Sequence, residues 1–311
     1  MPWKKPILSR LAVLLTALPF LAACNDLSSP RTSEPPWANV ELHDVVYANG
    51  QYVAVGGCCD PVVLTSPDGK SWTRRGLPKE ANRGLRGVTY GGGQFVAVGS
   101  YSAVYPATIL TSPDGIRWRV QDSGVYEEIG AVAYGNGKYV AVGGFGLILT
   151  SLDGVRWSVQ PRKTWGHLHD ILFANNTFIA VGNDAILTSS DGERWTVISK
   201  EQYGDVYGLS AVAYGNGRYV AVNWTSPNRF VISTDGVNWT AYPNTDSQDE
   251  AFWGLTFGAG WFMAVGEKGV VALSEDGITW QKQRPVSNKL RGATYGDRFV
   301  VVGFGTILIT Q

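Results

Sequence analysis

The sequence is poor in charge, in cysteine and in histidine. Charged residues make up 17% of the 311 residues, below the roughly 25% of an average soluble protein, and 26 basic residues balance 26 acidic ones. Nucleic-acid-binding chains usually carry a basic excess, so this balance argues against wholesale nucleic-acid binding. The apolar run at residues 11–23 is too short to span a bilayer.

Motifs for catalysis and for cofactor binding are also missing. No Ser-His-Asp arrangement stands out, and the glycine-rich runs lie in hairpin turns without a following helix, so they are not phosphate-binding loops. The three histidines are His43, His167 and His169, and no cysteine or carboxylate completes a zinc set with them. We therefore predict no metal site and no cofactor.

Glycine, tryptophan and short β-rich runs are abundant, and they recur in a fixed order. In residues 131–157, two such runs are joined by Asn136-Gly137, a pair that supplies the positive φ angles of a tight hairpin. A third run leads through Asp153-Gly154 to a fourth around Trp157. The aspartate can accept backbone N–H groups, the glycine can take the left-handed turn position, and the tryptophan can cover the sheet. The stretch predicts four short antiparallel strands.

This unit is repeated along the chain. The first hairpin occurs seven times, at residues 45–55, 88–98, 132–142, 171–181, 212–222, 255–265 and 293–302. The box Ser-x-Asp-Gly-x-x-Trp occurs six times, 38 to 46 residues apart, with Asp68, Asp114, Asp153, Asp191, Asp235 and Asp276. A period near 40 with four strands per unit is typical of a propeller blade. We predict an all-β, seven-bladed β-propeller of four-stranded antiparallel blades over residues 39–311.

The boxes resemble those of bacterial Asp-box (BNR-like) repeat propellers, a repeat type found in sialidases and photosystem assembly factors. The resemblance covers roughly residues 40–311. In the sialidase-type box one residue separates aspartate from glycine, whereas here glycine follows directly and tryptophan comes one residue sooner. The resemblance implies a structural role for the six box aspartates and no particular activity.

The N-terminus resembles a bacterial lipoprotein signal. Lys4, Lys5 and Arg10 precede the apolar run, which ends in Leu-Ala-Ala before Cys24. The resemblance implies a signal peptide at residues 1–23, lipidation of Cys24 and a bacterial envelope location; Asn25 favours the outer membrane. An ordinary signal peptide with an incidental cysteine is the alternative. Residues 24–38 are rich in Ser and Pro, which predicts a flexible tether.

The seventh unit has no box after its third strand, so its closure is open to two interpretations. An N-terminal segment near Trp37 could supply the outer strand, although its spacing differs from that of the box tryptophans. Otherwise the seventh blade is incomplete or irregular.

One position at the start of each innermost strand varies sharply while its neighbours hardly change. Since sites arise where repeats depart from identity, these residues are candidate ligand contacts around the channel mouth: His43, Arg86, Gly130, His169, Ser210, Trp253 and Arg291. Arg291, His43 and Arg86 fall on consecutive blades, and a basic arc is expected there with Arg74, Arg75, Lys79, Arg83, Arg284 and Lys289. An acidic side is expected opposite, from Glu127, Glu128, Asp170, Asp205, Asp246, Asp249 and Glu250. Such polarity would attract an anionic group; solvated loop charges without a ligand are the alternative.

Longer second-to-third connections in three blades bring further candidates to the same face. Tyr101, Tyr105 and Trp224 suit stacking on a sugar or a peptide. Cys58 and Cys59 are the only thiols besides Cys24, and an oxidising compartment would allow a disulfide between them, with two free thiols as the alternative.

Two classes of function remain. The first is a membrane-anchored, monomeric, non-catalytic module that binds a protein or an anionic glycan at the channel mouth. The second is a sialidase-like glycoside hydrolase, which the family resemblance would build from an arginine cluster, a Tyr-Glu pair and an acid: Arg86, Arg291, Glu128 with Tyr126, Tyr203 or Tyr207, and Asp170. Because the Arg-Ile-Pro motif of many sialidases is missing, we favour binding.

Overall fold

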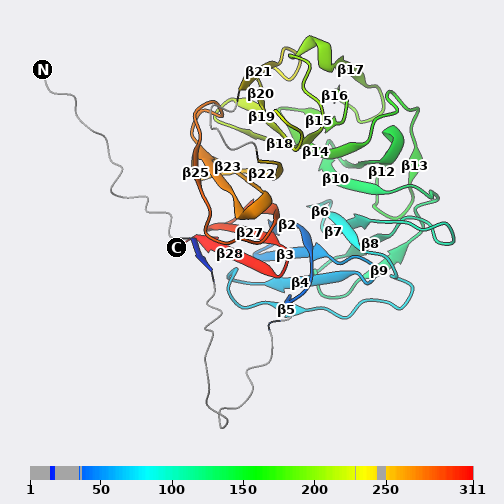
Figure 1. The fold of residues 1–311 in the computed structure, drawn as a ribbon. Coiled ribbons are helices and arrows are strands. Elements are labelled where there is room, and N and C mark those ends of the chain that lie inside the picture. Colours follow the sequence, from blue (N-terminus) through cyan, green and yellow to red (C-terminus); the bar gives the residue numbers. More distant parts are fainter. Residues whose placement is uncertain (1–14, 18–34, 36, 228, 244–249, 311) are drawn as a thin grey trace, which may run out of the picture.

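The computed structural model describes residues 15–17, 35, 37–227, 229–243 and 250–310. It confirms the predicted all-β ring: seven antiparallel sheets lie radially around one axis, in chain order (Figure 1). In the described ranges no helix has the length and hydropathy needed to cross a bilayer.

Each blade begins with a strand at the axis and builds outward. The innermost strands are β2 (Leu42–Ala48), β6 (Leu85–Gly91), β10 (Ile129–Gly135), β14 (Leu168–Ala174), β18 (Leu209–Gly215), β22 (Phe252–Gly258) and β26 (Leu290–Tyr295). The second strands are β3 (Gln51–Gly56), β7 (Gln94–Gly99), β11 (Lys138–Gly143), β15 (Thr177–Gly182), β19 (Arg218–Asn223), β23 (Trp261–Gly266) and β27 (Phe299–Gly303).

The third strands are β4 (Val62–Ser66), β8 (Ile109–Ser112), β12 (Ile148–Ser151), β16 (Ala185–Ser189), β20 (Arg229–Ser233), β24 (Val271–Ser274) and β28 (Thr306–Thr310). The outer strands of blades one to six are β5 (Thr73–Arg74), β9 (Arg119–Gln121), β13 (Ser158–Val159), β17 (Thr196–Ser199), β21 (Thr240–Pro243) and β25 (Gln281–Gln283). Three short 3₁₀ turns lie in connections: η1 (Gly144–Gly146), η2 (Lys200–Gln202) and η3 (Glu267–Gly269).

The seventh blade is closed differently from the others. Its own part of the chain provides three strands, and the three-residue β1 (Leu15–Ala17) pairs antiparallel with the outer edge of β28. Trp37, where the sequence placed the closing strand, lies in a turn and packs on the core between blades seven and one. The segment near Trp37 therefore contributes apolar packing and no strand, and of the two interpretations of the closure the irregular seventh blade is confirmed.

Neighbouring blades meet where an aromatic ring of one innermost strand lies on a glycine of the preceding one. A Cβ on Gly135 would lie 2.1 Å from Cγ of Phe173, and the same contact joins Gly91 to Tyr134 and Gly215 to Phe257. A side chain at these glycines would occupy the space of the ring. In the sequence, the first strand of a repeat alternates large side chains such as Val132 and Tyr134 with small ones such as Ala131 and Ala133, which agrees with this packing.

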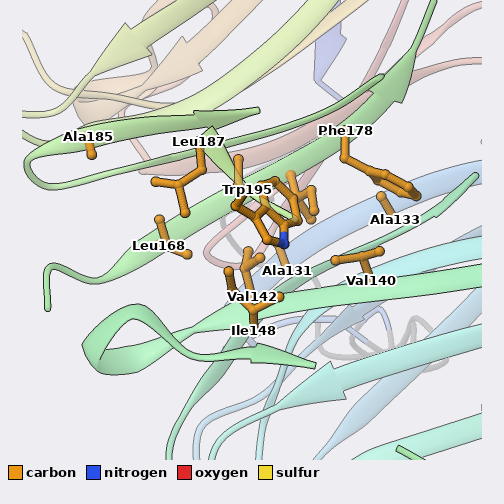
Figure 2. Packing of buried hydrophobic residues seen from close by; sticks show 12 residues of the cluster. Ala131, Ala133, Val140, Val142, Ile148, Leu168, Phe178, Ala185, Leu187 and Trp195 are labelled. Atoms are coloured by element: carbon orange, nitrogen blue, oxygen red, sulfur yellow. The ribbon is translucent and has the colours of Figure 1, made fainter. Parts of the chain in front are cut away.

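Turns and cores are built from the boxes. Oδ1 of each box aspartate accepts the backbone N–H groups two and three residues on, at 2.8 to 2.9 Å. The box tryptophan donates its indole N–H to the carbonyl of the box glycine at 2.8 to 3.1 Å. Figure 2 shows Trp195 of blade four among Val140, Val142 and Ile148 of blade three, so the ring belongs to the core between blades.

The glycine contacts predict a steep penalty for added volume. Replacing Gly135 by valine should lower the free energy of unfolding by about 1–3 kcal/mol or more, because the new side chain would displace the Phe173 ring. Gly76→Val is the matched control, since a Cβ there meets nothing within 4 Å. Denaturant unfolding of the two variants measures the difference in the free energy of unfolding. Equal stabilities would contradict the predicted penalty for added volume between the blades.

Candidate functional site

The seven variable positions share a structural cause. Each innermost strand has a register shift near its start, and the residue inside the shift is the variable one in every blade, for example His43 between Leu42 and Asp44. A β-bulge leaves its extra residue unpaired and redirects its side chain. These positions vary because they contribute neither to the hydrogen-bonded ladder nor to the core between blades.

All seven bulge residues line one cavity of about 480 Å³ at the axis. The sequence prediction that His43, Arg86, Gly130, His169, Ser210, Trp253 and Arg291 converge is therefore correct in position. A second ring lies two residues before the bulges and adds Glu41, Glu128 and His167 to the lining. Sequence reasoning had named Glu128 and His167 separately but had missed Glu41 and the shared position. Variation at this second position was the signal that could have identified it.

Arg86 joins the two rings through hydrogen bonds. Its Nε donates to Glu128 Oε1 at 2.6 Å and its Nη1 to His43 Nε2 at 2.5 Å. His43 can accept this bond only as neutral imidazole. Burial, together with the Arg86 charge, lowers the pKa of His43 to about 3.

A second network surrounds Trp253. Its indole N–H donates to Glu267 Oε1 at 2.9 Å, Trp224 stacks on its ring at 5.7 Å, and Lys289 and Arg291 lie over it at 4.4 and 4.5 Å. Glu267 also binds Lys289, and Arg291 binds Glu41, both at 2.8 Å. Trp224, Trp253 and Arg291, all predicted ligand contacts, thus belong to a mutually paired cluster.

Four cations of the predicted basic arc, Arg86, Arg284, Lys289 and Arg291, are paired with carboxylates. The charges alternate as ion pairs: Arg86 with Glu128, Arg162 with Glu127, Arg284 with Glu250, Lys200 with Asp205, Lys289 with Glu267 and Arg291 with Glu41. Arg75 donates instead to Thr65 Oγ1 of its own blade. A paired guanidinium offers an incoming anion much less attraction than an isolated one.

Two partly buried aspartates connect blades. Asp170 accepts the N–H of Ile171 and, from the next blade, that of Val212, both at 2.8 Å; Asp44 bridges blades one and two in the same way through Val88. Burial raises the pKa of Asp170 to about 7 and that of Asp44 to about 6, although the N–H bonds oppose the rise. Asp170, the acid of the hydrolase hypothesis, is engaged in bridging two strands.

The remaining parts of that hypothesis do not come together. Glu128 lines the cavity and is held by Arg86. The described residues that line the cavity do not include Tyr126, Tyr203 or Tyr207. Tyr203 is 2% exposed, inside the core of blades four and five. The geometry therefore assembles no Tyr-Glu pair.

The other candidates have separate places. Cys58 and Cys59 are free, exposed thiols with their sulfurs 4.0 Å apart. His169 Nε2 bonds to Asn183 Oδ1 at 2.8 Å, and its ring lies 6.2 Å from that of His167. Across the described ranges no three histidine, cysteine or acidic side chains meet as metal ligands. Cys24, the tether before Pro35, Asp246 and Asp249 lie outside the described residues.

Exposed apolar side chains divide by face. We call the end of the ring that carries the second-to-third and blade-to-blade connections the mouth face, and the end with the Asp turns the box face. Every strongly exposed aromatic residue of the described chain lies on the mouth face: Tyr101, Tyr105, Tyr126, Phe145, Trp165, Tyr207 and Phe304. The exposed aliphatic residues, except Val104, lie in box turns or on outer strands: Ile116, Val120, Leu152, Val155, Val159, Val197, Val237 and Ile278. The sequence analysis did not identify Phe145, Trp165 or Phe304 as candidates. Trp165 falls at no repeat position, and this was a signal that could have identified it.

Comparison with known proteins places the chain among propellers. No protein-family model matches it, and no curated sequence is significantly similar. Solved structures that resemble it include YCF48 bound to D1 peptide (TM-score 0.68, 18% identity, 88% of this chain and 92% of that one) and YCF48 from Cyanidioschyzon merolae (0.68, 19%, 89% and 98%). The Pan2 WD40 domain of Neurospora crassa is similar as well (0.63, 9%, 90% and 91%). The chain is thus a seven-bladed β-propeller, and at these identities the likeness shows the fold alone.

His43 should stay neutral across the physiological range. The pKa of His43 is about 3 in the folded protein and 6.5, the ordinary value, in the unfolded chain. Its contribution to stability is therefore present above pH 6.5 and is lost as pH falls towards about 3. Imidazole NMR, assigned with His43→Gln, should show no titration of His43 between pH 8 and 5. A midpoint near 6.5 would mean that Arg86 does not donate to the ring.

Proposed function

We propose that this protein is a non-catalytic binding module that holds a partner protein on its mouth face. One observation carries the proposal: the exposed aromatic side chains of the described chain gather on this face, and none lies on the box face. Aromatic residues are enriched in protein interfaces and supply most hot spots, because they bury a large area at a small cost in side-chain entropy.

The cavity supports binding of a neutral or mixed-charge surface. Arg86 and Arg291 are each paired with a carboxylate, so the cavity offers an anionic glycan few unpaired cationic groups. The solved propeller YCF48 bound to D1 peptide is a structural precedent for a peptide on this fold. These points favour a protein partner over a glycan and over sialidase chemistry.

Site-specific photocrosslinking in living cells tests the proposal. A photoreactive phenylalanine analogue at Tyr126, Phe145 or Tyr207 should give discrete adducts with a common partner protein. Leu152 and Val237 on the box face are the controls, since they are exposed as well, and they should give none. Adducts confined to the box-face positions would refute the proposal, and so would the absence of adducts from both sets.

We further propose that the protein is a lipoprotein anchored in the bacterial envelope through Cys24, with the outer membrane as its location. Cleavage before Cys24 would remove β1, so blade seven of the mature protein would keep only its three strands β26, β27 and β28. The lipobox-like sequence before Cys24 supports this. Wild-type protein should take up labelled palmitate and sediment with membranes, whereas Cys24→Ser should take up none and appear in the soluble fraction. Membrane sedimentation that does not depend on Cys24 would refute the anchor.

A further inference from the structure

On the mouth face, a closed ion pair contacts two exposed aromatic residues. Arg162 Nη2 donates to both carboxylate oxygens of Glu127, at 2.6 and 2.8 Å, and both side chains are 28% exposed. Three connections meet here. Glu127 lies in the β9 to β10 connection, Phe145 in the β11 to β12 connection, and Arg162 in the β13 to β14 connection. This cluster joins blades two, three and four.

Arg162 also fixes the aromatic residues around it. Its Nη1 donates to the carbonyl oxygen of Phe145, and its guanidinium lies over the ring of Trp165 at 5.7 Å. Tyr126 directly precedes Glu127 in the chain. Phe145 is 51% exposed, Tyr126 58% and Trp165 77%. Phe145 and Trp165, both contacted by Arg162, are therefore an aromatic platform on a neutral support.

Phe145 is presented by a strained turn. It lies at the centre of η1 with φ 52°, a left-handed conformation that costs a non-glycine residue energy, and its ring contacts His167 at 5.1 Å. Lys268 occupies the same position of η3 in blade six with φ 51°. The turn is thus a property of the fold, and an aromatic ring at its tip is particular to blade three.

The chemistry of the platform limits its ligand. Arg162 and Glu127 satisfy each other, so they leave few polar groups for the many hydroxyls of a sugar, each of which needs a partner when it is desolvated. They also cancel in charge, so the platform does not select an ionic segment. The exposed parts of the Phe145 and Trp165 rings remain, together with the indole N–H of Trp165, which donates to no other atom in the described part of the chain.

We propose that the aromatic platform binds an uncharged, proline-containing extended segment of a partner protein. Proline rings pack on aromatic faces, and the exposed carbonyls of a polyproline II backbone accept hydrogen bonds from indole and phenol groups. Such a segment is already extended before binding, so little conformational entropy is lost. This inference rests on the proposed function and adds the chemistry of the segment that is bound.

Binding of short end-blocked peptides to the purified full-length protein tests the inference. Fluorescence anisotropy is measured with a dye-labelled peptide of repeated Ala-Pro-Pro triplets, with the same peptide carrying alanine for proline, and with sialyllactose as a competitor. The proline peptide should bind, its alanine counterpart at least tenfold more weakly, and sialyllactose should not displace it.

Trp165→Ala should weaken binding of the proline peptide by about thirtyfold, the size of a hot-spot contact. Leu152→Ala is the matched control, because Leu152 on the box face is also 77% exposed. Both variants should melt at the wild-type temperature, since neither side chain is in the core.

The outcomes separate the two proposals. Equal binding of the proline and alanine peptides, or full affinity in Trp165→Ala, overturns the platform, while mouth-face crosslinks to a partner protein would leave the proposed function standing. Displacement of the peptide by sialyllactose overturns the platform in favour of a glycan. Failure of both the peptides and the crosslinks overturns both proposals.

Discussion

The ring depends on the contact between an aromatic ring on one innermost strand and a glycine on the preceding one. Phe173 on Gly135, Phe257 on Gly215 and Tyr295 on Gly258 repeat this contact around the axis. At these junctions the glycine leaves room for the ring, whereas alanine, Ala48 or Ala174, occupies the corresponding position in blades one and four. Each sheet is positioned by its two neighbours, and the axis of the propeller follows from local packing.

That packing also explains why the channel can differ from blade to blade. The glycine contact lies at the far end of the innermost strand, whereas the bulge lies at its start and takes one residue out of the hydrogen-bonded ladder. A substitution at the bulge therefore changes the cavity and leaves the blade contact intact. Residues as different as Gly130, Trp253 and Arg291 occupy this position within nearly identical strands.

The repeats made the fold and the convergence of the bulge residues predictable, because both follow from local patterns copied in phase. Pairing between side chains was not predictable in the same way. Whether Arg86 is free or bound depends on Glu128, which lies one blade away and 42 residues later, and on which way each side chain turns. Closure by Leu15–Ala17 also escaped prediction, because that segment carries no repeat signature and lies in the apolar run expected to be a signal peptide. The exposure of loop aromatic residues was also not predictable: Phe145 lies in a connection between strands, where no repeat pattern indicates its exposure, and it is 51% exposed.

The paired charges of the cavity and the exposed aromatic residues of the rim determine where a ligand would gain most free energy on binding. Inside the cavity, a charged ligand would have to break ion pairs such as Arg291 with Glu41 and leave a partly buried charge without its partner, which is costly. On the rim, aromatic side chains are exposed to water and gain free energy as soon as apolar surface covers them. The same fold thus uses its polar side chains to line and stabilise the channel, and it leaves its aromatic residues around the mouth available for contact. Under the proposed function, the binding surface therefore lies on the rim, with the paired charges beneath it as the rigid support.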